Sequence, residues 1–186
     1  MLNEESKKIL LSLARRTIRE YITKGIVPKF ETKNEVLKKP CGAFVTLHNS
    51  GVLRGCIGII EASQPLYMTV EEMAIQAARS DPRFEPVTPE ELEEIDIEIS
   101  VLYPKKRAAG IDEIELGRHG VIVKKGFAQG VFLPQVASEA GWTKKEFMEH
   151  LCEGKAGLKK DAYLDSNTEI YIFEADVFGE RMMRNF

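Results

Sequence analysis

The sequence predicts an α+β fold with mainly antiparallel sheets and packed helices. Helical and strand patterns are mixed along the chain, two pairs of strands are joined by short turns, and strict strand–helix–strand repetition is absent. Short turns join antiparallel strands, whereas parallel strands need long crossover connections. The 186 residues fit one domain or two small interleaved lobes, and no repeat or linker divides them.

The first expected element is an amphipathic helix over residues 4–23. Its apolar side chains recur with a 3.6-residue period. Asn3 can cap the start of this helix, and Gly25 can end it. Residues 27–40 contain two prolines and are interpreted as an irregular connection.

A β-hairpin and a second helix follow. Strands are expected over residues 43–48 and 52–60, because the turn signal Asn49-Ser50-Gly51 separates two apolar runs. The second helix is expected over residues 65–80, with Ser63 as its cap and the following proline in its first turn.

The remaining elements mix strands with one long helix. Residues 94–103 form the clearest strand, with isoleucines on one face and Asp96 and Glu98 on a solvated face. A second hairpin pairs residues 121–124 with 131–133. A third long helix starts with the capping box Thr143-Lys144-Lys145-Glu146 and stops at Gly154. The final strand is expected over residues 170–178.

Composition excludes several classes of protein. The net charge is −3 without a large basic block, so nucleic-acid binding is not indicated. Three dispersed cysteines favour a reducing compartment, and neither a signal peptide nor a run of about 20 apolar residues is present. We therefore expect a cytoplasmic protein without membrane segments. The histidines and cysteines lack metal-ligand spacing, and nucleotide and serine-hydrolase motifs are absent, so no metal and no cofactor is expected.

The segment richest in chemistry is Leu53-Arg54-Gly55-Cys56-Ile57-Gly58. On an extended strand Arg54, Cys56 and Gly58 share one face, and the first two lie about 7 Å apart. A guanidinium at that distance favours a thiolate and can also hold an anionic substrate. The two glycines allow backbone or ligand to approach closely.

The residues that face this segment depend on the register of the hairpin. If His48 pairs with Val52, then Thr46 faces Arg54, and His48, Arg54 and Cys56 line a polar face. If the register slips by one residue, apolar side chains face Arg54 and Cys56 instead. The sequence leaves both registers open.

A structural interpretation competes with the functional one. Cysteine is commonly a small buried hydrophobe, and strand glycines commonly mark bulges. Elsewhere, Asp81-Pro82-Arg83-Phe84 is either a turn with an internal ion pair or a turn that aims Arg83 at a cleft. His119 lies between two glycines and is a candidate base, although a lone histidine is more often structural. Gln135 follows a strand end and could orient a ligand amide.

Together these segments resemble the AMMECR family. The resemblance rests on the motif at residues 53–58 and on further stretches, in order along nearly the whole chain: Ser80-Asp81-Pro82-Arg83-Phe84, Glu98-Ile99-Ser100-Val101-Leu102, Gly117-Arg118-His119-Gly120 and Gly130-Val131-Phe132-Leu133-Pro134-Gln135-Val136-Ala137. It ends around His150-Leu151-Cys152 and Lys155-Ala156-Gly157-Leu158. The length is that of a stand-alone prokaryotic or archaeal member, with a single domain of this type over residues 1–186.

The resemblance implies two closely associated lobes with a cleft between them. It places Arg54, Gly55, Cys56, Ile57 and Gly58 on the functional surface. It also implies Memo-type and radical-SAM proteins as partners, because family members occur beside them or fused with them. No particular reaction follows from it.

Two hypotheses of different class result. In the first, the protein is a cysteine-dependent enzyme or modification factor in which Cys56 is the nucleophile, Arg54 stabilises the thiolate and His119 is a distant base. Gly55, Ile57, Gly58, Arg83 and Gln135 then contact a small or peptide ligand. In the second, the protein is a non-catalytic adaptor that binds a ligand or protein. A third possibility, nucleic-acid binding, is disfavoured by the acidic net charge.

Overall fold

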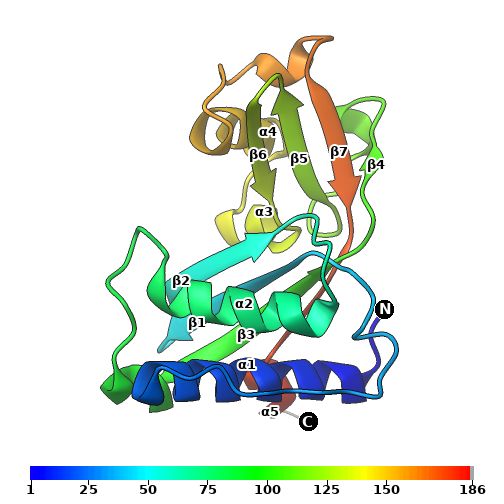
Figure 1. Ribbon diagram of the computed structural model, residues 1–186. Coiled ribbons are helices and arrows are strands. Elements are labelled where there is room, and N and C mark those ends of the chain that lie inside the picture. Colours follow the sequence, from blue (N-terminus) through cyan, green and yellow to red (C-terminus); the bar gives the residue numbers. More distant parts are fainter. Residues whose placement is uncertain (185–186) are drawn as a thin grey trace. The chain divides into compact units, whose positions relative to one another are not determined.

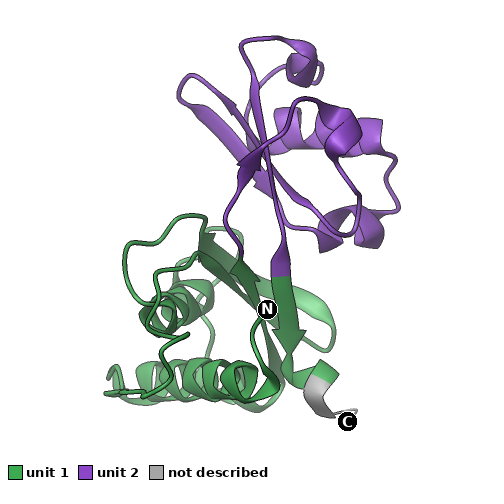
Figure 2. Ribbon diagram, turned by 90° about the vertical axis from the view of Figure 1, so that its right-hand side faces the viewer, with its two compact units in different colours: residues 1–102, 176–186 green, residues 103–175 purple. Residues whose placement is uncertain are grey.

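The computed structural model describes residues 1–184, which divide into two compact units (Figures 1 and 2). Unit 1 comprises residues 1–102 and 176–184, and unit 2 comprises Tyr103–Ala175. Each unit has a four-stranded sheet and its own hydrophobic core. The predicted α+β fold with antiparallel strand pairs is confirmed.

Unit 1 is a sheet with its two long helices on one face. The strand order is β2-β1-β3-β8, and the helices α1 and α2 pack together against the sheet (Figure 1). The elements are α1 (Glu4–Lys24), β1 (Ala43–Asn49), β2 (Val52–Ile59), α2 (Leu66–Arg79), β3 (Ile95–Leu102), β8 (Ala175–Gly179) and α5 (Glu180–Arg184). The apolar faces of β1 and β3 supply fully buried side chains to this core, among them Val45, Leu47 and Ile99.

The two long helices of unit 1 start in different ways. The Asn3 side chain accepts a hydrogen bond from the Ser6 N–H at 2.9 Å, and Gly25 ends α1 at φ 69°, as predicted. Ser63 does not cap α2, and that prediction is wrong. The first N–H groups of α2 instead donate to backbone carbonyls of the connection between α1 and β1, so they need no side-chain cap (Leu66 to Lys39 at 3.0 Å and Tyr67 to Leu37 at 3.1 Å).

Unit 2 is a sheet in the order β4-β7-β5-β6 with short helices. Its elements are β4 (Lys106–Arg107), β5 (Gly120–Lys125), β6 (Ala128–Phe132), α3 (Gln135–Ala140), α4 (Lys144–His150) and β7 (Glu169–Phe173). The predicted capping box is present, because Thr143 Oγ1 accepts from the Glu146 N–H and Glu146 accepts from the Thr143 N–H. The α-helical geometry ends at His150 and continues as a π-helical turn over Leu151–Lys155.

The final strand expected over residues 170–178 is two strands. β7 ends at Phe173 in the sheet of unit 2, and β8 begins at Ala175 in the sheet of unit 1. The strand-like sequence pattern runs through both, which is why the sequence did not show the break at Glu174.

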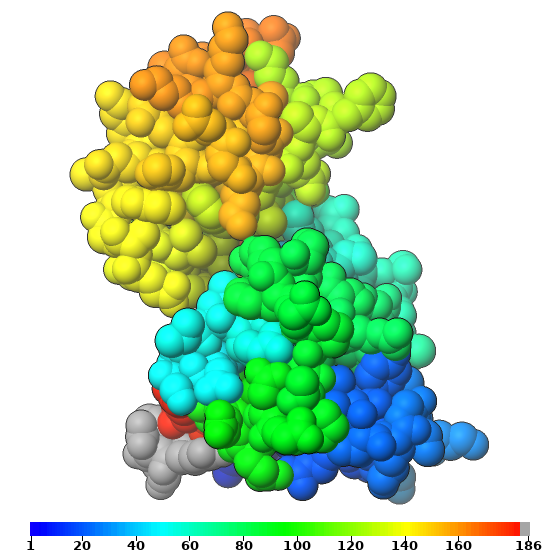
Figure 3. Space-filling view, turned by 90° about the vertical axis from the view of Figure 1, so that its left-hand side faces the viewer, coloured from blue at the N-terminus to red at the C-terminus, as the bar shows by residue number. Residues whose placement is uncertain are grey.

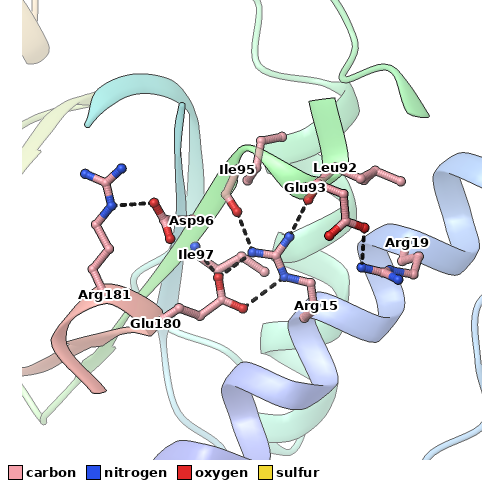
Figure 4. Close-up of polar contacts among 9 residues, drawn as sticks. All are labelled: Arg15, Arg19, Leu92, Glu93, Ile95, Asp96, Ile97, Glu180 and Arg181. Carbon is pink, nitrogen blue, oxygen red and sulfur yellow. Dashed lines mark hydrogen bonds and ion pairs between the residues drawn. The ribbon is translucent and has the colours of Figure 1, made fainter. Parts of the chain in front are cut away.

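Charged side chains hold the C-terminal helix of unit 1 to the rest of that unit (Figure 4). Glu180 accepts hydrogen bonds from the Arg15 guanidinium and, at 3.0 Å, from the Ile97 N–H. Arg181 pairs with Asp96, which is only 8% exposed. The prediction of a solvated face is therefore wrong for Asp96, because α5 covers it.

No helix within residues 1–184 has the length and apolar character that crossing a membrane requires.

Candidate functional site

The motif at residues 53–58 lies on β2, next to a tight turn. Ser50 and Gly51 both have positive φ, at 51° and 86°, which is typical of a two-residue type I′ hairpin turn. Leaving this turn, Asn49 pairs with Val52 and His48 pairs with Leu53.

These two pairs belong to the slipped register, but the register then shifts again between Leu47 and His48, so neither predicted register holds at Arg54 and Cys56. Leu47 pairs with Gly55 and Thr46 with Cys56, which leaves Arg54 as the extra residue of a β-bulge. The alternation that placed Arg54 and Cys56 on one face therefore does not run unbroken between them.

The two glycines of the motif occupy places where a side chain would clash. A Cβ atom on Gly55 would lie 2.3 Å from the carbonyl oxygen of Ala77, because the end of α2 packs directly on β2. A Cβ atom on Gly58 would lie 2.2 Å from the ring of Phe44. Ile57, which lies between Cys56 and Gly58, packs against the core of unit 1. These contacts account for the three residues by packing, and their predicted ligand contacts stay a prediction.

Arg54 is held by protein groups away from the cysteine sulfur. Its Nε and Nη2 atoms donate to the two carboxylate oxygens of Glu91 at 2.6 and 3.0 Å, and Nη1 donates to the Glu85 carbonyl at 2.9 Å. The hydrogen bonds from Arg54 lower the pKa of Glu91. In the space-filling view, the surface of residues around 85–93 (green) lies beside the surface of the first hairpin (cyan), as these bonds require (Figure 3). Arg54 therefore ties the bulge to this segment.

Cys56 is bonded through its backbone and its sulfur. Its N–H donates to Asp81 Oδ2 at 2.8 Å, and its carbonyl accepts from Arg83 at 3.4 Å. The Thr46 hydroxyl, directly across the hairpin, donates to Sγ at 3.3 Å. The side chain is intermediate in exposure.

Asp81 and Arg83 come from the turn that follows α2. The Nε and Nη2 atoms of Arg83 donate to the two carboxylate oxygens of Asp81, at 2.9 and 2.7 Å, so the predicted internal ion pair is present. Asp81 is 4% exposed, and its pKa is lowered to about 2, chiefly by the hydrogen bond from Arg83. The pKa of Arg83 is raised, first by its bond to Asp81 and further by the charges of Asp81 and Cys56.

The structure thus brings together a cluster of four residues, which we call the Cys56 cluster: Cys56, Thr46, Asp81 and Arg83. The sequence did not reveal the hydrogen bond between the Cys56 N–H and Asp81 or the role of Thr46. The signal for Asp81 was its position two residues before an arginine, directly after a predicted helix end. The pairing of Thr46 with Cys56 could be predicted only with the register of the hairpin known, and the bulge changes that register.

The other two cysteines have different surroundings. Cys41 donates to the Leu102 carbonyl at 2.9 Å, and burial raises the pKa of its thiol. Cys152 is fully buried in unit 2, and burial raises its pKa as well. Both thiols are therefore disfavoured as thiolates.

His119 and Gln135 belong to unit 2. His119 is 6% exposed, and its Nδ1 accepts a hydrogen bond from the Glu115 N–H at 3.1 Å. Gln135 is the first residue of α3. Their predicted roles toward Cys56 stay predictions, as does the predicted cleft. Within residues 1–184, no group of three or more histidine, cysteine, aspartate or glutamate side chains could hold a metal ion.

Comparison with known proteins gives a consistent family. The AMMECR1 family model matches residues 11–178. A protein from Thermococcus gammatolerans is 43% identical, with 98% of this chain and 94% of the relative covered. Protein MK0488 from Methanopyrus kandleri is also 43% identical, with 95% and 89% covered.

A solved structure agrees with these relatives. The crystal structure of the uncharacterized protein PH0010 from Pyrococcus horikoshii has a TM-score of 0.92 at 39% identity, with 96% of this chain and 93% of that chain covered. The family match over most of the length and the relatives above 40% identity lead to one conclusion: the chain belongs to the AMMECR1 family.

Proposed function

We propose that this protein uses the thiol of Cys56 as a nucleophile or redox-active group toward a small or peptide ligand. The observation that carries the proposal is the Arg83 guanidinium, which Asp81 holds against the strand residue Cys56. A nearby cation and a hydrogen bond to sulfur both favour the thiolate, which is the reactive form of cysteine.

The contacts of Cys56 support this role in two ways. Thr46 donates a hydrogen bond to the sulfur, which stabilises a negative charge there. The two backbone bonds, to Asp81 and from Arg83, hold the Cys56 peptide in one position. The Asp81 carboxylate offsets part of the positive field of Arg83, so its main contribution is to position the guanidinium.

Arg83 replaces Arg54 in this proposal as the cation beside the thiol. Arg54 serves the fold, because its bidentate pair with Glu91 ties the bulge on β2 to the segment around residue 91. His119 as a distant base, and Memo-type or radical-SAM proteins as partners, remain parts of the proposal that rest on the sequence and the family resemblance.

A second candidate function is a non-catalytic binding module. It is favoured by the packing contacts of Gly55 and Gly58 and by the saturation of Arg54, since these explain much of the motif without chemistry. Under this hypothesis Cys56→Ser leaves the binding of a ligand or partner intact.

The test compares the reactivity of the three cysteines in the folded protein. Each thiol is alkylated with iodoacetamide at a series of pH values, and the rate at each site is read by mass spectrometry. We expect Cys56 to react fastest at neutral pH, because burial disfavours the thiolates of Cys41 and Cys152. The activated thiol is contradicted if Cys56 reacts no faster than Cys41, which is of similar exposure.

A further inference from the structure

Unit 2 contains a cavity of about 520 Å³ whose lining includes none of the four residues of the Cys56 cluster. Its lining includes two rings from largely buried residues, the imidazole of His119 and the phenyl ring of Phe173. Its size is within the range of small-molecule sites, which are roughly 300–1,000 Å³.

Two glycines, Gly117 and Gly120, allow the backbone around His119 to form this part of the cavity wall. Gly117 adopts φ 84°, which allows the tight turn from Glu115 to His119. Gly120 lies under the ring of Phe173, where a Cβ atom would approach ring carbons to 2.2 Å. The motif Gly117-Arg118-His119-Gly120 therefore sets an imidazole and a phenyl ring into the wall of the same cavity.

His119 presents one nitrogen that the protein does not use. Nδ1 accepts a hydrogen bond from the Glu115 N–H, so in the neutral ring the proton lies on Nε2. Within residues 1–184, Nε2 has no hydrogen-bond partner, although the residue is only 6% exposed. Because Nδ1 is turned to the backbone, we infer that the Nε2–H edge is the donor available to the cavity.

The rim of the cavity carries charges that are mostly paired with one another. Arg118 contacts Glu115 at 3.0 Å and Glu174 at 2.9 Å, and Lys106 lies 3.9 Å from Glu113. Three carboxylates against two cations leave the rim slightly acidic. An anionic ligand is therefore disfavoured at this site.

We propose that this cavity binds a small, neutral heteroaromatic molecule that accepts a hydrogen bond from His119 Nε2–H. The ligand ring packs against the apolar wall that includes Phe173, and its ring nitrogen or carbonyl accepts the hydrogen bond from Nε2–H. This site is additional to Cys56, and the proposal does not depend on the function proposed for that thiol.

The test uses two probes that differ in one ring atom. Benzimidazole is neutral at pH 7.5 and has a ring nitrogen that accepts a hydrogen bond, whereas indole has the same shape without that acceptor. Binding is followed on the full chain by NMR through the ¹⁵N signals of His119. We expect benzimidazole to shift the Nε2 signal and to bind at least ~10-fold more tightly than indole.

A matched variant separates binding from structure. In His119→Asn the side-chain oxygen can replace Nδ1 as the acceptor for the Glu115 N–H, but the Nε2–H donor is lost. We expect this variant to keep the thermal stability of the natural protein and to bind both probes equally weakly. The proposal is overturned if the natural protein binds neither probe, if it binds them equally, or if the variant retains the preference for benzimidazole.

Discussion

At the scale of single residues, the types of side chain in the motif did not show which residues they contact. Arg54 is two residues from Cys56 in the sequence, yet its guanidinium binds Glu91, 37 residues away. Arg83 is 27 residues from Cys56 and contacts its carbonyl. Proximity along a strand is therefore a weaker guide than the side-chain contacts that α2 and the following turn create.

The Asp81 carboxylate gives a testable contribution to stability. Its pKa is lowered from 3.8 to about 2, so the folded state binds this proton less readily than the unfolded chain does. The stabilisation is fully present above pH 4–5 and is lost as the pH falls toward about 2. We expect Asp81→Asn to lower the free energy of unfolding by about 1–2 kcal/mol at neutral pH.

Urea unfolding between pH 2 and 7 measures this effect. The difference between the natural protein and Asp81→Asn should shrink as the pH approaches 2, because the natural carboxylate is then protonated. Asp112→Asn is the control, since Asp112 is exposed and its loss should change stability by less than about 0.5 kcal/mol. A difference that does not depend on pH would show that Asp81 does not stabilise the fold through its charge.

At the scale of elements, sequence reasoning succeeded where local chemistry decides. The Asn3 cap, the Gly25 stop and the Thr143 capping box depend on neighbouring residues, and all three are present. It failed where a distant segment decides. The start of α2 uses carbonyls of residues 37 and 39, and the strand expected over residues 170–178 is shared between two sheets.

The candidate site divides in the same way. The motif at residues 53–58 and the Asp81–Arg83 ion pair were visible in the sequence. The glycines of the motif were compatible with a bulge, but the sequence did not show that Arg54 is the residue left without a cross-strand partner. The pairing of Thr46 with Cys56, and with it the hydrogen bond to sulfur, followed only from the structure.

The close packing of α2 on β2 predicts a steep cost at Gly55. A methyl group there meets the Ala77 carbonyl at 2.3 Å, and a backbone oxygen cannot move aside as a side chain can. We expect Gly55→Ala to destabilise the protein by about 2–3 kcal/mol in chemical unfolding. Gly154→Ala is the control, because no atom outside its own helical turn lies within 4 Å of its added Cβ. Equal stabilities for the two variants would contradict the packing described for the motif.

At the scale of the whole molecule, each unit has its own core, and unit 1 is closed by segments from both ends of the chain. Arg15 of α1 binds Glu180 of α5 and the carbonyls of Leu92 and Ile95, at 2.8 and 2.5 Å (Figure 4). Glu180 is mostly buried, with 16% of its side chain exposed. This network joins the first helix, β3 and the last helix of the unit.

Removing the charge of Glu180 should therefore matter more than removing an exposed one. We expect Glu180→Gln to lower the free energy of unfolding by about 2–3 kcal/mol, because Arg15 is left without a carboxylate in a largely buried place. Glu93→Gln is the matched control, since Glu93 pairs with Arg19, which lies on α1 like Arg15, but the Glu93 side chain is 79% exposed. Loss of this carboxylate should lower the free energy of unfolding by less than about 1 kcal/mol. The two variants are compared by thermal unfolding. An equal loss of stability in both would contradict the larger contribution expected from Glu180.

The central claim is that Arg83, held by Asp81, supports the reactivity of Cys56, while Arg54 serves the fold. The most direct measurement is the pH midpoint of Cys56 alkylation in the natural protein, Arg83→Gln and Arg54→Gln, with the fold of each variant checked by circular dichroism. We expect Arg83→Gln to raise this midpoint by about 0.5–1 pH unit, Arg83→Lys to restore part of the difference, and Arg54→Gln to leave it nearly unchanged. An unchanged midpoint in Arg83→Gln, or a larger shift in Arg54→Gln, would contradict the claim.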